Sequence, residues 1–366
     1  MNNNVINSDK LHSNHRLPWI DVAKSFSSIL VVMTHILDYC HLQIVISFCL
    51  PAFFMFSGLC FSSKISFFDF LKKKFRQIMI PYYIWGLIAI FVYQVLGRFV
   101  TQNDIIPFYQ CIIGLLSGTA KSGYMQFNLH LWFLPVLFVM QLIFYPICKT
   151  IQKKDNKKRL LLSVTATVLL TVLSVTLITL NPNIVLPLGI ITALKLIPFF
   201  SLGYVIQHTA LYTYKYDNTP KSKVILILIL LVSLPLLVFL SLKHYSFLGI
   251  RINYSRDILG NIPLFFASSL CCILLFIVLS FLFQKSKILI YIGQKSLPLL
   301  LMQKYPIILF KNIIPFTSLY IKQNNILVVV LVTIIVISLC LLVDWIIVKY
   351  FPWLYGIKNK RRTKNA

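Results

Sequence analysis

The sequence predicts an all-α integral membrane protein with about ten transmembrane helices and both termini in the cytoplasm. Hydrophobic residues make up 58% of the 366 residues and charged residues 12%, whereas about 25% of the residues in a soluble domain are charged. Apolar runs of about 20 residues, the length of a bilayer-spanning helix, recur along the chain. The 35 Lys and Arg residues far outnumber the nine acidic ones and gather between these runs. That placement reports membrane topology and excludes a nucleic-acid-binding protein.

The ten predicted spans are joined mostly by short connections. They lie near 19–41, 43–62, 77–97, 131–150, 160–180, 184–207, 223–242, 261–283, 288–310 and 326–349. The two tails and the connections after even-numbered spans hold 23 of the bases, and the other connections hold 7. The positive-inside rule then places both termini in the cytoplasm, as an even number of spans requires. We expect a polar tail over 1–18, a membrane domain over 19–350 and a basic tail over 351–366.

Two connections on the opposite side of the membrane are long. Residues 98–130 contain the apolar stretch IIPFYQCIIGLLSG, which is too short to span and is interrupted by Pro107 and Gly114. This pattern predicts an interfacial or re-entrant segment, of the kind that often lies over a substrate site. Residues 243–260 either contact a sugar through their Tyr, Arg, Asn and Asp side chains or form an ordinary solvated loop.

The eight cysteines lie mostly within apolar runs, with no C-x-x-C motif and no alternating Cys/His spacing. Such cysteines are typically small buried apolar side chains, so we expect neither disulfides nor a metal site. The sequence also has no Gly-rich phosphate loop, no G-x-S-x-G and no H-x4-D motif. The absence of H-x4-D argues against the soluble-type glycerolipid acyltransferases.

The first span carries a polar stripe within an arc of about 60° of the helix. The stripe consists of Asp21, Lys24, Ser28 and His35. Lys24 and His35 are eleven residues apart, which corresponds to about 16 Å along a helix axis. Ionisable groups at membrane depth face a protein interior or a water-filled cavity, which makes them functional candidates. The structural alternative is a salt bridge from Asp21 to Lys24 or to another helix, together with one hydrogen-bonded histidine.

Several motifs in a consistent order resemble one membrane family. The segments are IDVAK with His35 eleven positions after its lysine, FCLPAFFMFSG (48–58), FLKKKFRQIMIPYYIWG (70–86), NLHLWFLPVLFV (128–139) and IGQKSLPLLLMQ (292–303). Together they resemble the integral-membrane acyltransferase-3 family, and most closely its branch of surface-polysaccharide O-acetyltransferases of the fucose 4-O-acetylase type. The resemblance covers roughly 19–310 and agrees with the ten-span core of that family.

The resemblance implies transfer of an acyl group, usually acetyl from cytoplasmic acetyl-CoA, to a sugar hydroxyl of a cell-surface polysaccharide or its lipid-linked precursor. His35 matches the first-helix histidine of the family, and Lys24 matches the basic residue eleven positions before it. Two positions depart from the pattern: Cys49 stands where the branch often has His, and Gln303 stands where the late motif usually ends in His. His35 is therefore the main candidate base, and His130 is the second.

These residues have expected roles. A neutral histidine is the commonest general base near neutral pH, and Asp38, one turn beyond His35, is placed to orient its ring. Lys24 would meet an anionic or carbonyl part of the acyl-CoA, and Asp21 would neutralise Lys24 when the site is empty. The substrate-binding candidates are His130, Trp132, Arg76 and Gln303. The basic run that contains Arg76 either attracts the CoA phosphates or serves only as a topology signal.

The expected protein is thus a multi-pass enzyme of the plasma membrane, which in a bacterium is the inner or cytoplasmic membrane. Its expected partners are acyl-CoA, a surface polysaccharide or lipid-linked glycan, and membrane lipids. The competing class is a transporter or flippase of glycan or lipid-linked glycan, which also has kinked spans and buried charges. Against it, the polar residues concentrate in the first helix and no internal repeat is visible. A structural partner of a glycan synthase would leave the polar stripe unexplained. The acceptor sugar, the choice between acetyl and succinyl, and the oligomeric state stay open.

Overall fold

The computed structural model describes residues 17–37, 41–100, 105–180, 184–213, 219–249 and 252–356. Within these ranges the regular elements are all helical, and there is no strand. The α-helices are α1 (Pro18–Ile36), α2 (His41–Ile46), α3 (Leu50–Leu59), α4 (Phe67–Lys74), α5 (Ile80–Val100), α6 (Phe108–Ser117), α7 (Phe133–Gln152), α8 (Asn156–Leu180), α9 (Ile190–Gln207), α10 (Ala210–Thr213), α11 (Pro220–Leu248), α12 (Ile262–Leu282), α13 (Lys287–Gln294), α14 (Ser296–Met302), α15 (Lys304–Ile308), α16 (Pro315–Lys322) and α17 (Ile326–Tyr350).

The described residues contain nine segments that are long and apolar enough to cross a membrane. This confirms the predicted all-α polytopic class. The segments are Pro18–Ile36, His41–Leu59, Phe67–Val95, Leu129–Gln152, Asn156–Leu180, Pro187–Gln207, Pro220–Leu248, Ile262–Leu282 and Ile326–Tyr350. They correspond to nine of the ten predicted spans.

The tenth predicted span, 288–310, is not one helix. It is divided into α13, α14 and α15, followed by the π-helical turn η7 (Leu309–Ile313). Two prolines explain the division, because Pro298 and Pro306 are each the third residue of a new short helix. A proline in a first helical turn costs no hydrogen bond, whereas inside a continuous helix it would remove one.

The third span begins earlier than predicted. Instead of starting near residue 77, the helical segment runs from α4 through the π-helical turn η2 (Phe75–Met79) into α5. Ser66 caps the start of α4 by accepting a hydrogen bond from the backbone N–H of Asp69. The π-turn ends two residues before Pro81, whose missing N–H would interrupt a regular helix here. The basic run 72–76 therefore lies on a helix and not in a loop.

One contact joins the third membrane segment to the residues that follow the last one. The guanidinium Nε of Arg76 donates to the carbonyl oxygen of Gly356 at 2.5 Å, so these residues lie at the same level. Seven long helices separate them: α5, α7, α8, α9, α11, α12 and α17. If each of these crosses the membrane once, the broken segment 287–313 must cross as well to bring the two residues together. The contact therefore supports an even number of crossings.

Residues 98–130 contain the ten-residue helix α6, which is too short to span, as predicted. The hydroxyl of Tyr82 in α5 donates to the carbonyl of Leu115 in α6 at 2.7 Å. Helix α6 is therefore anchored to the side of α5 and leads the chain back to the start of α7.

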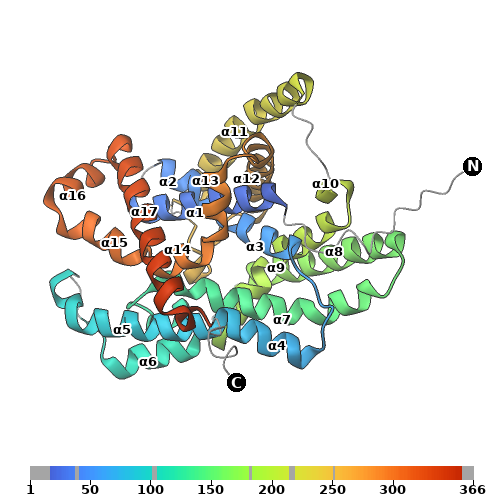
Figure 1. The fold of residues 1–366 in the computed structure, drawn as a ribbon. Coiled ribbons are helices and arrows are strands. Elements are labelled where there is room, and N and C mark those ends of the chain that lie inside the picture. Colours follow the sequence, from blue (N-terminus) through green and yellow to red (C-terminus); the bar gives the residue numbers. More distant parts are fainter. Residues whose placement is uncertain are drawn as a thin grey trace, which may run out of the picture.

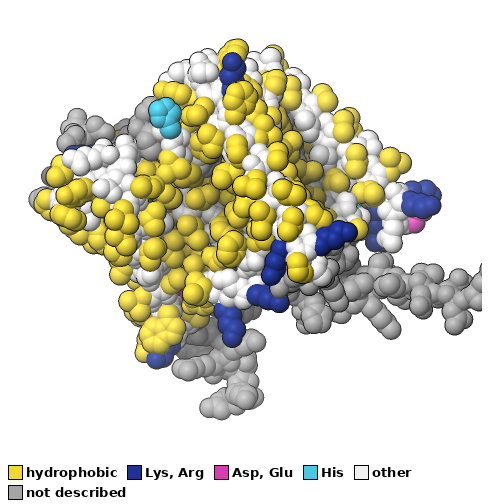
Figure 2. Space-filling model, turned by 90° about the horizontal axis from the view of Figure 1, so that it is seen from above, with side chains coloured by type: hydrophobic (Ala, Val, Ile, Leu, Met, Phe, Trp, Pro, Cys, Tyr) yellow, Lys and Arg dark blue, Asp and Glu magenta, His cyan; other side chains and the backbone are white. Residues whose placement is uncertain are grey.

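Helix α1 lies inside the bundle, where it packs against α3, α12, α13 and α17 (Figure 1). Gly293 permits the close approach of α13, because a Cβ at this position would lie 1.8 Å from the backbone oxygen of Asp21. By contrast, only 11% of the apolar window of α8 and 17% of that of α11 is buried. The view in Figure 2 shows a surface dominated by hydrophobic side chains, with Lys and Arg mainly along one edge. The polar stripe thus belongs to an interior helix, while the apolar outer helices suit contact with lipid.

Candidate functional site

Two histidines from distant parts of the chain meet in the interior. The rings of His35 and His130 stack with their centroids 3.8 Å apart and their planes 27° from parallel. His35 lies in the last turn of α1, and His130 lies in the 3-10 turn η4 (Leu129–Trp132). The side chain of Asn128 caps this turn by accepting the backbone N–H of His130 at 3.1 Å. The cap therefore sets the direction in which the His130 ring leaves the backbone.

The stacked rings line a cavity of about 240 Å³, here called the histidine cavity. Its walls come from α1, η1 (Ser47–Cys49), the start of α3, η4 and α7, α14, and the loop that begins at Ile252. The lining residues are Val31, Thr34, His35, Ser47, Cys49, Leu50, Leu129, His130, Trp132, Phe133, Ile252, Asn253, Tyr254, Ser255 and Leu300. Residues 252–255 of the predicted outer loop are thus part of the wall, and so are residues at the end of 98–130.

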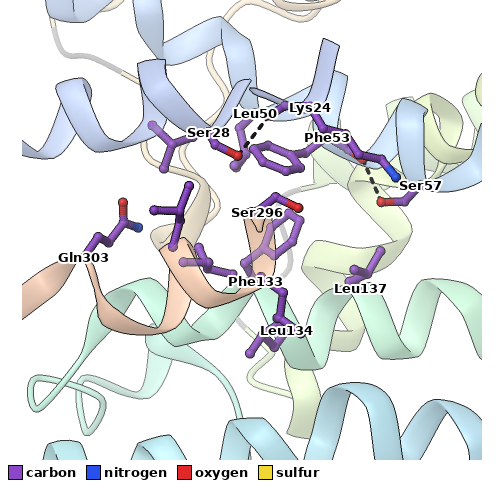
Figure 3. A pocket seen from close by; sticks show the side chains of 14 residues that line it. Lys24, Ser28, Leu50, Phe53, Ser57, Phe133, Leu134, Leu137, Ser296 and Gln303 are labelled. Atoms are coloured by element: carbon purple, nitrogen blue, oxygen red, sulfur yellow. Dashed lines mark hydrogen bonds between the residues drawn. The ribbon is translucent and has the colours of Figure 1, made fainter. Parts of the chain in front are cut away.

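A second cavity, here called the lysine cavity, has a volume of about 120 Å³ and contains Lys24 (Figure 3). Its polar lining consists of Lys24, Ser28, Ser57, Ser296 and Gln303, and its apolar lining of Val31, Leu50, Phe53, Phe133, Leu134, Leu137, Leu297, Leu299 and Leu300. The ammonium Nζ of Lys24 lies 3.7 Å from Cys60 Sγ. Gln303 is 1% exposed, and its Nε2 has no hydrogen-bond partner among the described residues. That N–H2 group is available to a ligand.

The two cavities adjoin, because four apolar side chains line both of them. These junction side chains are Val31, Leu50, Phe133 and Leu300. Lys24 and Ser28 lie on one side of the junction and His35 lies on the other, about 16 Å from Lys24 along α1. The polar stripe of α1 therefore follows a path from one cavity to the next.

The structure separates the predicted site residues into three groups. Lys24 and Gln303 line the lysine cavity, and His35, His130 and Trp132 line the histidine cavity. Asp21 and Arg76 line neither of them. Asp21 is buried against α13, and the guanidinium of Arg76 is bound to the carbonyl of Gly356. Asp38 lies outside the described residues.

Two residues that were not among the individual site candidates also shape the histidine cavity: Tyr254, in the loop 243–260, and Lys304. The hydroxyl of Tyr254 donates to the carbonyl of Ser47 at 3.0 Å. Burial raises the pKa of the Tyr254 hydroxyl well above its ordinary value, so this donor stays protonated. Lys304 Nζ donates to the carbonyls of Gln126, at 3.1 Å, and Phe127, and so holds the segment before His130. Lys304 is a basic residue inside an apolar run, directly after Gln303. This position in the sequence indicates that its charge lies in the protein interior.

Lys195, a buried charge with no predicted role, supports the wall of the histidine cavity. It is 1% exposed, and its Nζ lies 3.8 Å from Asp257 Oδ2. Lys121 Nζ lies 3.7 Å from the same oxygen, and Thr192 donates to Asp257 Oδ1 at 2.6 Å. One carboxylate thus ties the loop that carries Tyr254 to α9 and to the turn after α6.

The described part of the chain offers no group of three or more His, Cys, Asp or Glu side chains arranged to hold a metal ion. The seven cysteines in this part of the chain are free thiols. The polar groups that line the two cavities include imidazole, ammonium, hydroxyl, amide and thiol groups.

A family model described as an acyltransferase domain matches residues 17–345. No curated protein and no solved structure matches the chain. The matched range contains every residue that lines the two cavities.

Proposed function

The chain belongs to the acyltransferase-3 family and is a membrane acyltransferase, and on this premise we propose that it is an O-acetyltransferase of a surface glycan. The donor would be acetyl-CoA from the cytoplasm. The acceptor would be a sugar hydroxyl of a cell-surface polysaccharide or of its lipid-linked precursor, in line with the resemblance to the fucose 4-O-acetylase type. The observation that carries the proposal is the pair of stacked imidazoles in a cavity that adjoins a second, lysine-containing cavity.

The two cavities suit the two substrates. Lys24 and His35 are about 16 Å apart, so they cannot both touch the reacting carbonyl group. We assign Lys24 to an anionic part of the donor and His35 to the reacting atoms. The CoA arm is long and thin, so it can reach from the lysine cavity with its thioester toward the junction. The buried N–H2 of Gln303 is then a hydrogen-bond donor for a carbonyl oxygen on the donor side.

The transfer step needs a base and a path for one proton. The acceptor hydroxyl oxygen attacks the carbonyl carbon of the thioester while His35 takes the hydroxyl proton. The tetrahedral intermediate collapses, the C–S bond breaks, and the sulfur of CoA takes the proton back from His35. The products are the O-acetyl ester and CoA with a free thiol. Because two adjacent imidazolium rings would repel each other, His130 stays neutral while His35 holds the proton.

The acceptor is proposed to enter the histidine cavity. His130 Nδ1 is buried and has no hydrogen-bond partner among the described residues, so it can accept a hydrogen bond from a sugar hydroxyl. Trp132 offers a broad apolar ring with one N–H donor, a combination that suits a sugar ring. Asn253 and Ser255 add an amide and a hydroxyl to the same wall.

The direct test is acyl transfer by the purified full chain in nanodiscs. Acetyl-CoA labelled in the acetyl group is mixed with a lipid-linked glycan extracted from the same cells without this protein, so that the acceptor hydroxyl is not yet acylated. We expect label in the glycan, held by a base-labile ester. If the wild-type protein never transfers label from a short acyl-CoA but moves unmodified glycan across a vesicle membrane, the transporter function replaces this proposal.

A further inference from the structure

We propose that the four junction side chains select a short, uncharged acyl group for transfer. This inference rests on the proposed function and adds to it the side chains that would select the acyl group of the donor. The junction is where the lysine cavity meets the histidine cavity. An acyl group held on the lysine side must be presented through the junction to react beside His35.

The junction is built from four different elements. Val31 belongs to α1, Leu50 begins α3, Phe133 begins α7 and Leu300 belongs to α14. Leu50 and Phe133 come from opposite sides of the lysine cavity (Figure 3). An acyl group at this position is therefore surrounded by hydrocarbon.

At least two of the four walls are rigid. The ring of Phe133 stacks on Phe54 with centroids 4.8 Å apart and meets Phe53 edge-on at 5.7 Å. Val31 is a β-branched residue within a helix, where one side-chain rotamer is strongly preferred. A longer acyl chain can thus gain space only by displacing Leu50 or Leu300.

A charged acyl group such as succinyl is disfavoured by the same lining. A carboxylate at the junction would lose its water and meet only apolar side chains. The ionisable side chains that line the two cavities are Lys24 on one side and the two histidines on the other, apart from cysteine and tyrosine. If the succinyl carboxylate paired with Lys24, the acyl group would be held away from His35. The apolar junction therefore favours acetyl and rejects succinyl.

The test measures transfer from acetyl-, propionyl-, butyryl- and succinyl-CoA by the full chain in nanodiscs, with the same lipid-linked glycan throughout. One methylene in a hydrophobic pocket typically changes kcat/KM by about 10- to 200-fold. We expect wild type to prefer acetyl over butyryl by at least about 10-fold and to use succinyl no better than butyryl. Leu300→Ala should raise the butyryl-to-acetyl ratio by about 10-fold or more and leave succinyl poor, because alanine is also apolar.

Leu142→Ala is the matched control, because Leu142 is also half-buried but lines neither cavity. It should leave the ratio unchanged. Phe133→Leu enlarges the junction more conservatively and replaces Leu300→Ala if that variant fails to fold. The proposed selection would be overturned if wild type used butyryl-CoA or succinyl-CoA as well as acetyl-CoA. It would also be overturned if Leu142→Ala changed the butyryl-to-acetyl ratio as much as the junction variants do. Either result would leave acyl transfer itself in place. Absence of transfer from all four donors would remove the proposed function and the selection with it.

Discussion

At the residue scale, the proposed mechanism depends on which of the two histidines contacts the reacting atoms. His35 and His130 are in ring contact, but they reach the cavity differently. His35 lies on an interior helix beside the junction, whereas His130 lies on a capped turn with one buried ring nitrogen that has no partner among the described residues. We therefore propose different kinetic roles for the two histidines.

His35→Ala should lower the rate of acyl transfer by about 10²–10⁴-fold, the usual contribution of a general base, with near-normal protein abundance. His130→Ala is the informative companion: it should raise the KM for the glycan more than it lowers kcat, because it removes acceptor binding. Steady-state kinetics in nanodiscs, with melting temperatures measured in parallel, separate the two. If His35→Ala chiefly lowered the melting temperature, the histidine would be structural, since leaving buried polar groups unsatisfied costs about 1–3 kcal/mol.

We propose that Lys24, which lines the lysine cavity, supplies a positive charge for binding the acyl donor. Lys24→Arg should keep substantial activity, whereas Lys24→Ala should lose most of it through a higher KM for acetyl-CoA, because only the first variant keeps the charge. The measurement is the KM for acetyl-CoA at a fixed glycan concentration. Equal losses in both variants would point to a role in packing or to a geometry that only lysine provides.

At the scale of elements, one carboxylate holds the loop that closes the histidine cavity. Asp257 links this loop to Lys195 and Thr192 of α9 and to Lys121 in the turn after α6. The same loop carries Tyr254, whose hydroxyl is bound to Ser47. The shape of the histidine cavity is therefore set partly by contacts outside it.

Asp257→Asn should lower stability by up to about 3–5 kcal/mol, because it removes the carboxylate beside a buried lysine. It should also raise the KM for the glycan while leaving the KM for acetyl-CoA unchanged. Thermal unfolding and separate donor and acceptor titrations measure these effects. The double variant Asp257→Asn with Lys195→Met should recover part of the stability, since removing both charges is less costly than removing one. A raised donor KM in the single variant would contradict the assignment of the two cavities.

At the scale of the whole molecule, topology depends on whether the broken segment 287–313 crosses the membrane. Nine crossings would put the two ends of the chain on opposite sides, and ten would put them on the same side. The basic tail and the contact between Arg76 and Gly356 favour the even number.

Reporter fusions test this arrangement. Fusions after Lys154 and at the C-terminus should give a cytoplasmic signal, and a fusion near Thr119 should give an external one, because of the distribution of bases. An external signal at the C-terminus would mean that segment 287–313 does not cross. A cytoplasmic signal at Thr119 would refute the orientation of the first three spans.

The sequence by itself determined the class of protein, nine of the spans and the alignment of Lys24, Ser28 and His35 along one helix. These features are local: apolar length decides what crosses a bilayer, and helix geometry decides which residues share a face. Pro298 and Pro306 explain why segment 287–313 is broken in the structure. From the sequence alone, however, a proline does not reveal whether a helix kinks or ends and begins again.

The tertiary structure alone decided which distant residues meet. Three contacts join segments more than 60 residues apart: His35 stacks on His130, Arg76 binds Gly356, and Lys195 pairs with Asp257. The second of these contacts keeps Arg76 away from both cavities. No periodicity encodes such contacts, because they arise when whole helices pack and bury their side chains together. The junction between the two cavities belongs to the same class, since its four side chains come from four elements that only packing brings side by side.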